Sequence, residues 1–241
     1  MSLAEMVRKS VWGRGLSAQV LEAVIAQCHQ TEVAAGQTIV RAGEPALHWP
    51  GLISGVACMS VSMPDGKETS LASLAAGGWF GEGTLIKRGL WQYDGRALSD
   101  CQVALMPLDC FEQLRQTSLP FNHYLQQLMG ARMGGFIAKL CVDRMLDSTA
   151  RIAQSLAGLY QPEVYPDPGP LLHLSQAELG QLAGVSRQRT NIALQTLERA
   201  GLVSVSRRGI RVLDLGGLHA YRSSTPGTEA LKKAPGRPKL S

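Results

Sequence analysis

The stretch from Leu174 to Leu202 constrains the fold more than any other part of this 241-residue chain. Ser175, followed three residues later by Glu178, is a capping-box pattern that predicts the start of a helix. Gly184 predicts a tight turn after that helix, because glycine enters the left-handed conformation at little cost. Ser186 is then expected to cap a second helix. The stretch therefore predicts two short helices joined by a tight turn.

The second of these helices begins with polar residues and continues with apolar ones. Helical spacing predicts that its apolar residues lie inward, and these are Ile192, Ala193, Leu194 and Leu197. In the major groove of DNA, arginine pairs with guanine, and glutamine or asparagine pairs with adenine. The expected base-reading residues are Arg187, Gln188, Arg189 and Asn191. The alternative interpretation is a small helical hairpin with a solvated basic face.

Two short apolar segments follow the second helix and predict a hairpin. Residues 202–205 and 210–213 read as strands, with Arg207, Arg208 and Gly209 as the turn between them. Two helices and a basic hairpin together predict a winged helix-turn-helix. Side chains that position such a domain on DNA contact phosphates without reading the sequence. The expected phosphate contacts are Ser175, Ser186, Arg207, Arg208 and Arg211.

Charge is distributed unevenly along the chain, and the distribution favours DNA as the partner. Residues 171–241 contain 11 Lys and Arg against 4 Asp and Glu, whereas residues 1–170 contain 13 against 15. The formal net charge of +5 therefore conceals a basic C-terminal part on a slightly acidic body. A double-stranded DNA partner fits this segregation.

The N-terminal half has a different pattern, which predicts β-structure. An amphipathic helix is expected at about 17–28, and short apolar runs separated by glycine-containing turns follow between Thr31 and Leu108. Short strands at this regular spacing indicate an antiparallel barrel or roll. The fold class expected for the whole chain is therefore α+β, with an N-terminal antiparallel β-roll, a long helix and a C-terminal winged helix-turn-helix.

A long helical pattern joins the two halves. Apolar residues from Leu125 to Met145 recur at three- and four-residue steps, which is long for a helix that only packs on its own domain. We expect a two-stranded interface between the subunits of a homodimer, the alternative being a buried helix within one domain. The expected divisions are a sensing domain at 1–118, a dimerisation helix at 119–147, a DNA-binding domain at 148–222 and a basic tail at 223–241.

This order of elements resembles the Crp/Fnr family of transcription regulators. The resemblance rests on Pro64–Glu68 (PDGKE), Trp79–Leu85 (WFGEGTL), Leu146–Leu159 and the helix-turn-helix segment, and it extends from about Thr31 to Tyr221. It implies a cyclic-nucleotide-binding-like sensor domain and a DNA-reading homodimer, with RNA polymerase as a further partner if the protein is an activator. By this resemblance, Arg187, Gln188 and Ile192 match positions where the family contacts bases. Ile192 replaces the usual arginine, so the operator of this protein should differ from the sequence that arginine-containing members read.

The resemblance also locates an effector pocket and argues against cyclic AMP in it. Family members that bind cyclic AMP have a glutamate, matched by Glu82, and an Arg-Ser or Arg-Thr pair about ten residues later, which aligns with Trp91-Gln92. A buried phosphate needs a positive partner, and neither residue supplies one. The residues expected to line the pocket are Trp79, Gly81, Glu82, Trp91, Gln92, Phe136 and Ile137.

Several effectors remain open from the sequence. The first expectation is a small apolar or aromatic molecule beside Trp79, Trp91 and Phe136, and the next is that these aromatic residues fill the pocket themselves. Lys87 or Arg88 could still reach a phosphate from another direction. Haem bound through His29, His48 or His123 and a thiol switch at Cys101, Cys110 or Cys141 are further alternatives. An iron–sulfur cluster is excluded, because only Cys28 lies in the first 50 residues.

Other classes of protein fit the sequence poorly. No set of nucleophile, base and orienting residue is visible, so we do not expect an enzyme. No metal or other cofactor is expected, since the five cysteines are scattered without metal-ligand spacing. The absence of a long apolar run predicts no membrane partner and a cytoplasmic protein. The rival function is a small-molecule-binding barrel with incidental DNA affinity. The tail contains Pro235–Lys239, a basic segment that resembles a minor-groove hook.

Overall fold

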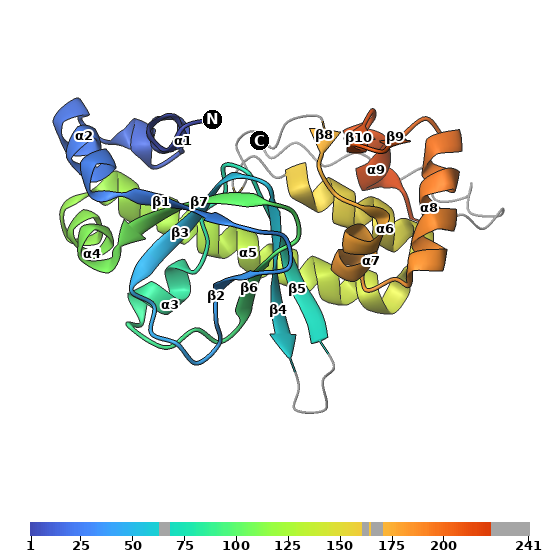
Figure 1. The fold of residues 1–241 in the computed structure, drawn as a ribbon, viewed down its shortest axis with the longest axis horizontal. Helices are drawn as coiled ribbons and strands as arrows, with labels where there is room; N and C mark the ends of the chain where they lie inside the picture. The colour runs from blue at the N-terminus through green and yellow to red at the C-terminus, as the bar shows by residue number, and fades with distance from the viewer. Residues whose placement is uncertain (63–67, 161–163, 165–170, 223–241) are drawn as a thin grey trace, which may run out of the picture.

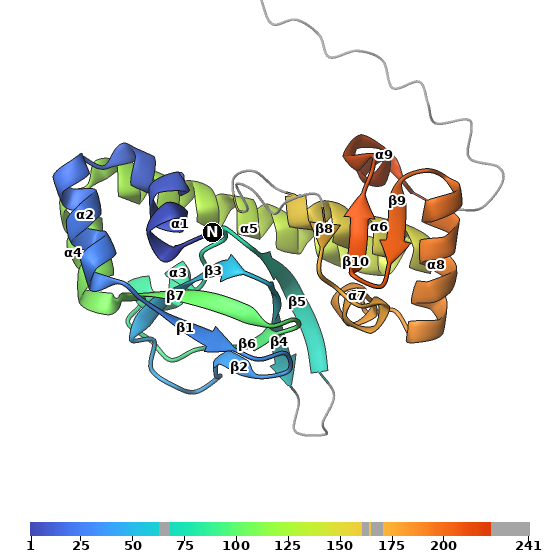
Figure 2. The ribbon, with the colours of Figure 1, turned by 45° about the horizontal axis from the view of Figure 1, so that its top comes forward.

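The computed structural model describes residues 1–62, 68–160, 164 and 171–222. Within these ranges a β-roll and a winged helix-turn-helix lie side by side, and one long helix runs past both of them (Figures 1 and 2). The PDGKE segment apart from Glu68, the proline-rich connection and the basic tail named above lie outside the described residues. None of the described helices is long and apolar enough to span a membrane.

The N-terminal part begins with helices and continues as a roll of two antiparallel sheets. The helices are α1 (Leu3–Lys9), which has a Ser2–Glu5 capping box, a 3-10 turn at Gly13–Gly15 and α2 (Ala18–Gln27). One sheet has the order β1-β7-β3, formed by His29–Val33, Cys101–Pro107 and His48–Ser54. The other has the order β2-β6-β4-β5, formed by Thr38–Val40, Asp94–Ala97, Val56–Ser62 and Glu68–Ala75. The predicted antiparallel roll is confirmed.

Two cores stabilise this domain. Between the sheets lies a buried cluster of Leu52, Ala57, Met59, Leu74, Phe80, Ala97, Cys101 and Val103. A second, aromatic cluster packs the N-terminal segment against the roll and the following helices, through Trp12, Trp49, Trp79, Phe111 and Phe121. The ring centroids of Trp49 and Trp79 are 4.7 Å apart. Burial of rings this large contributes much of the apolar surface that stabilises a small domain.

Helices connect the roll to the C-terminal domain. The short helix α3 (Glu82–Ile86) follows β5, α4 (Leu108–Thr117) follows β7, and α5 (Leu119–Met145) is the long helix. Ser118 caps α5 by accepting a hydrogen bond from the Phe121 amide. The N-terminal part of α5 is buried at Phe121, Leu125 and Leu128, whereas a later stripe that includes Met133 and Ile137 is exposed. One half of the helix therefore belongs to the core, and the other half presents an uncovered apolar face.

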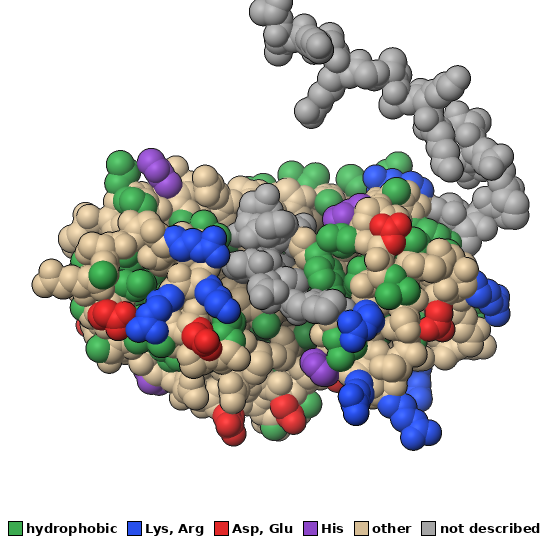
Figure 3. Space-filling model, turned by 90° about the horizontal axis from the view of Figure 1, so that it is seen from above, with side chains coloured by type: hydrophobic (Ala, Val, Ile, Leu, Met, Phe, Trp, Pro, Cys, Tyr) green, Lys and Arg blue, Asp and Glu red, His purple; other side chains and the backbone are tan. Residues whose placement is uncertain are grey.

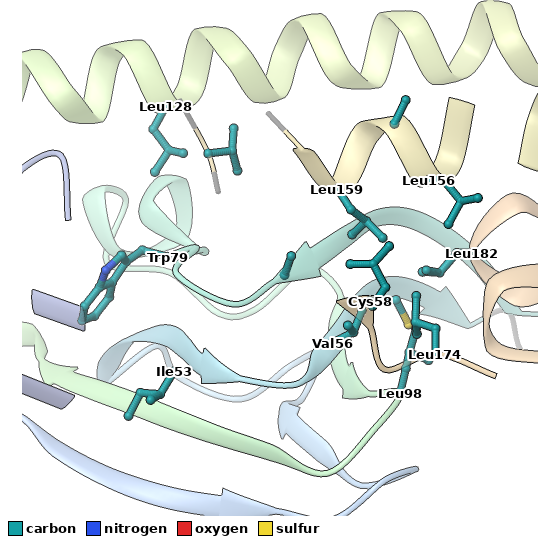
Figure 4. Packing of buried hydrophobic residues seen from close by; sticks show 14 of the residues in the cluster. Ile53, Val56, Cys58, Trp79, Leu98, Leu128, Leu156, Leu159, Leu174 and Leu182 are labelled. Carbon is teal, nitrogen blue, oxygen red and sulfur yellow. The ribbon is translucent and has the colours of Figure 1, made fainter. Parts of the chain in front are cut away.

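The C-terminal domain contains α6 (Ser148–Ala157), a 3-10 turn at Gly158–Tyr160, α7 (Gln176–Ala183), α8 (Arg187–Arg199) and α9 (Leu215–Ala220). Its sheet has the order β8-β10-β9, formed by Leu171–Leu172, Gly209–Val212 and Val203–Ser206. Leu159, Leu174 and Leu182 of this domain share one buried cluster with Val56 and Cys58 of the roll (Figure 4). The two domains of a subunit therefore share a continuous apolar core.

Candidate nucleic-acid interface and effector pocket

The turn between α7 and α8 is built as the sequence predicts. Ser175 Oγ accepts a hydrogen bond from the Glu178 amide at 3.2 Å, and the Glu178 carboxylate accepts one from the Ser175 amide. Gly184 has φ 61° and ψ 38°, which is the left-handed conformation. A Cβ at Gly180 would lie 2.7 Å from Thr190 Oγ1, so glycine there allows the two helices to approach closely. The capping box and the left-handed glycine are both confirmed.

Arg151 of α6 contacts the same turn through its guanidinium. Its Nη2 atom donates hydrogen bonds to the carbonyls of Ala183 at 2.7 Å and Gly184 at 3.1 Å. These carbonyls end α7, where the helix dipole favours a positive group. The same atom lies 3.3 Å from Oδ1 of Asp143 on α5. One guanidinium therefore connects the long helix to the helix-turn-helix, a contact that the sequence did not reveal.

The first turn of α8 presents the predicted polar side chains to solvent. Arg187, Gln188 and Arg189 are exposed and make no hydrogen bond or ion pair with the described part of the chain. Asn191 differs, because its amide donates to Gln176 Oε1 at 2.9 Å and accepts from Gln195 Nε2 at 2.9 Å. The structure thus leaves three of the four expected base-reading side chains available and engages the fourth in contacts within the protein.

Two details of the prediction for this helix are wrong. Ile192 does not lie inward, since 55% of it is exposed, whereas Ala193, Leu194 and Leu197 are buried as expected. Three consecutive apolar residues cannot all face one side of a helix that turns about 100° per residue. Ser186 stands at the N-cap, but its side chain makes no capping hydrogen bond. Its carbonyl instead accepts from Thr190 Oγ1 at 3.0 Å, and its exposed hydroxyl is not used for capping.

The wing forms at the predicted place. Strands β9 and β10 pair antiparallel, and the turn between them carries the exposed side chains of Arg207 and Arg208. Arg211 is also exposed, on β10, where it lies close enough to Tyr160 to act on its hydroxyl. Burial raises the pKa of Tyr160 to about 12, and the Arg211 charge opposes that rise. Basic side chains are visible at this end of the molecule in Figure 3.

In the sensor domain, the position expected to receive an effector is filled by Trp91. Gly81 has φ 89°, and an added Cβ there would overlap Cη2 and Cζ3 of the Trp91 ring. Trp91 is only 4% exposed, and its ring contacts those of Phe80 and Tyr93, with centroids 6.5 and 5.7 Å away. The indole therefore packs directly on the backbone at the start of α3.

Beside this ring, Glu82 already has a positive partner. Nε of Arg132 on α5 lies 2.7 Å from Glu82 Oε1, with the two side chains 11% and 4% exposed, and the same guanidinium donates to the Trp79 carbonyl. The other carboxylate oxygen, Oε2, is buried without a hydrogen-bond partner. Burial and the Glu82 charge raise the pKa of Tyr93 well above its usual range. Arg132 and Tyr93 were not among the expected pocket residues.

The remaining expected pocket residues are dispersed. Trp79 belongs to the aromatic cluster with Trp12 and Trp49, and its ring is not among those that contact Trp91. Gln92 is exposed and donates to the Leu90 carbonyl at 3.0 Å. Ile137 is 57% exposed on α5, and Phe136 packs against the core of the roll. Gly81, Glu82 and Trp91 thus form one site. The Trp79 carbonyl borders it through Arg132, whereas the Trp79 ring lies in another cluster and the Gln92 and Ile137 side chains are exposed.

A cavity of about 270 Å³ lies next to this site, between the roll and the DNA-binding domain. Its walls come from β5, α5, α6 and α7, and they include Leu71, Phe136, Val142, Gln154 and Leu182. Arg132 also reaches it, so one wall of the cavity adjoins the buried ion pair. Among the seven expected pocket residues only Phe136 lines this cavity. Its lining is drawn from both domains and is mixed, since the charged side chains of Arg132, Lys139 and Asp143 border it together with the apolar ones.

Of the alternative phosphate and thiol sites, those at Arg88, Cys101 and Cys110 receive little support from the structure. Nη2 of Arg88 is directed to Glu112 of α4, 3.3 Å away, and is therefore engaged outside the site at Gly81. Burial raises the pKa of the Cys101 and Cys110 thiols to about 11 each. A thiol that is protonated at neutral pH is a poor nucleophile, which argues against a redox switch at either residue.

An exposed polar recognition helix and a basic wing, joined by a long helix to a β-roll, define a DNA-binding transcription regulator. The family model for the cyclic nucleotide-binding domain matches residues 30–118, and the one for the Crp-like helix-turn-helix domain matches residues 150–221. The cAMP-activated global transcriptional regulator CRP of Pasteurella multocida is 31% identical over 195 residues, which are 80% of this chain and 93% of that protein. The chain belongs to the Crp/Fnr family.

Further relatives share the fold over most of their length. The cAMP-activated global transcriptional regulator Vfr of Pseudomonas aeruginosa is 29% identical, covering 77% of this chain and 89% of that protein. The structure of FixK2 from Bradyrhizobium japonicum matches with a TM-score of 0.67, over 82% of this chain and 98% of that one, at 16% identity. At that identity the match shows the fold alone, and the expected α+β architecture with a roll, a long helix and a winged helix-turn-helix is confirmed.

Proposed function

We propose that this regulator works as a homodimer that pairs along α5 and reads an inverted-repeat operator. The proposal of pairing rests on an uncovered apolar stripe, formed by Met129, Met133, Ile137 and Leu140 at steps of three or four residues. Met133 is 64% exposed, and Gly130 and Gly134 have open space around them, so another helix could approach closely. A second copy of α5 would remove this stripe from water. Crp/Fnr regulators act as dimers, which supports the same arrangement.

In this dimer each α8 would enter the major groove, with the two half-sites about 34 Å apart. The observation that carries the proposal is the exposed first turn of α8, where Arg187, Gln188 and Arg189 have no partner among the described residues. Arg207, Arg208 and Arg211, with the hydroxyls of Ser175 and Ser186, would hold phosphates on either side. Asn191 can read a base only if it releases Gln176, so we assign it a lesser part.

The effector of this regulator is proposed to be a small apolar or aromatic molecule rather than a cyclic nucleotide. The site beside Gly81 is filled by Trp91, and the Glu82 carboxylate is already paired with Arg132. A cyclic phosphate would arrive as an anion at a site whose cation is engaged, at a cost that hydrogen bonds to the backbone alone do not offset. The cavity lined by Phe136 is the proposed site for the effector, which would contact both domains and bias their arrangement.

Membership of the family supports proposals for the cellular location and for a further partner. A bacterial DNA-binding regulator meets its operator in the cytoplasm, which is the proposed location. RNA polymerase is the proposed further partner if the protein activates transcription. No catalytic step is proposed.

Footprinting on genomic DNA tests this function. Wild-type protein should protect discrete inverted repeats, and Arg187→Ala should lose that protection while keeping the fold. Equal binding by the variant would show that α8 is not the reading helix. Native mass spectrometry tests the dimer and the effector together: we expect two subunits, a single subunit for Met133→Glu, and no retained cyclic nucleotide. Saturable binding of cyclic AMP would contradict the proposed effector class.

A further inference from the structure

The exposed side chain of Ile192 is the least expected feature of the recognition helix. It lies one turn after Gln188, on the same face of α8, because residues four apart in a helix are neighbours. Gln195 follows on that face three residues later. An isolated exposed isoleucine is common on protein surfaces, but this one stands in the stripe that is directed to the groove, among polar side chains.

The neighbouring polar side chain, Asn191, is occupied within the protein and therefore does not compete with Ile192 for contact with a base. The Asn191 amide is engaged by Gln176 and Gln195, so these amides are joined into a chain of hydrogen bonds within the protein. Thr196 Oγ1 likewise donates back to the Ile192 carbonyl at 3.0 Å. Beyond the first turn of α8, Ile192 is therefore an exposed apolar side chain, 55% accessible, that could contact a base edge.

Among the groups that base pairs present in the major groove, the C5-methyl of thymine is the apolar one. Isoleucine has no donor or acceptor, so against any other base edge it would remove water from polar atoms without replacing their hydrogen bonds. Against a thymine methyl, both partners bury apolar surface. We propose, on the basis of the function proposed above, that Ile192 selects a thymine in each half-site by contact with its methyl group.

The helix geometry also locates this thymine. Gln188 and Ile192 are separated by four residues, which is about 6 Å along the helix axis. Base pairs are stacked about 3.4 Å apart along the DNA axis, so the thymine should lie within about two base pairs of the base that Gln188 contacts. The selected base is thus specified in chemistry and in approximate position.

Replacement of thymine by deoxyuridine tests the inference, because it removes the methyl group and nothing else. An operator is first selected from random duplexes with the full-length protein, and each symmetric pair of thymines is then replaced. We expect one pair whose replacement weakens wild-type binding by about fourfold per methyl, or about sixteenfold for the two half-sites. In Ile192→Ala the same replacement should change the dissociation constant by less than about twofold.

Two further variants make the result specific. Ile192→Val keeps part of the contact and should show an intermediate loss with deoxyuridine. Leu213→Ala is the matched control, since Leu213 is 56% exposed but follows the far end of the hairpin, where its amide bonds to the Leu202 carbonyl. This control should retain the full wild-type response.

The outcomes separate this inference from the function on which it rests. If no sequence is enriched from the random duplexes, the proposed operator reading fails and the inference fails with it. If an operator is found but Ile192→Ala weakens the thymine and uridine duplexes by the same factor at every position, the function stands and the methyl contact is refuted.

Discussion

The packing of Trp91 on Gly81 gives the sharpest prediction about the sensor domain. In Gly81→Ala the new Cβ overlaps two carbons of the buried Trp91 ring and lies 3.6 Å from a third, Cζ2. The positive φ of 89° costs about 1–2 kcal/mol for a residue with a Cβ, and the overlap costs about 1–3 kcal/mol more. The free energy of unfolding should therefore fall by about 2–5 kcal/mol.

A double-mutant cycle isolates the contribution of the ring. Trp91→Ala alone should cost about 3–5 kcal/mol, because it leaves a cavity beside Phe80. In that background Gly81→Ala no longer meets a ring, so only the backbone cost of about 1–2 kcal/mol remains. The coupling between the two substitutions should then be about 1–3 kcal/mol, measured by urea unfolding followed by far-UV circular dichroism.

Gly83→Ala is the matched control for this cycle. Gly83 lies two residues farther on, inside α3, and a Cβ there would meet nothing within 4 Å. Alanine in a helix is favoured over glycine by about 0.5–1 kcal/mol, so this variant should be neutral or slightly more stable. If Gly81→Ala costs the same with and without Trp91, the ring does not occupy the space above Gly81, and the argument against a cyclic nucleotide loses its main support.

Three other predictions concern charged side chains. Hydrogen bonds from Arg115 and Arg88 lower the pKa of Glu112 in the folded protein. The carboxylate therefore stabilises the fold above its unfolded pKa of about 4.3, and this contribution is lost as the pH falls through the lowered folded value. In thermal unfolding, Glu112→Gln should be less stable than wild type at neutral pH and equal to it in acid. Arg207→Ala should reduce the slope of log affinity against log salt by about 0.9 per subunit at every DNA sequence, by fluorescence anisotropy. Arg151→Met leaves the last carbonyls of α7 without their charged donor and should lower the local stability of α7 by about 1–3 kcal/mol. Hydrogen exchange in α7 should then be faster, and unchanged exchange there would show that the contact is not stabilising.

Local signals explain why the DNA-binding end was predictable. The capping box at Ser175 and the left-handed glycine at Gly184 act through neighbouring residues, so the sequence contains them in full. The run Ile192–Leu194 was assigned wrongly because all three residues are apolar. The buried face includes Thr190, a polar residue that an apolar pattern does not mark. Strand β3 lies within the region predicted to be strand-rich, but its HWPGLIS segment shows no alternation of polar and apolar residues because most of it is buried.

The sensor site depends on contacts between distant residues, which no local pattern reports. Arg132 lies 50 positions after Glu82, and only the packing of α5 beside α3 joins them. The sequence offered only a weak signal, since Arg132 is one of two arginines within the apolar segment from Leu125 to Met145. Similarly, Trp79 and Trp91 flank α3 in sequence, yet one ring belongs to the cluster around Trp49 and the other to the cluster around Tyr93.

In the proposed dimer, two copies of α8 are held by paired long helices and read two half-sites at a fixed separation. Insertion of about five base pairs between the half-sites of the selected operator rotates one of them by roughly half a turn around the DNA. The affinity of the protein for this lengthened operator, measured by fluorescence anisotropy, should fall to its affinity for a duplex with a single half-site. Unchanged affinity for the lengthened operator would contradict a rigidly paired reader.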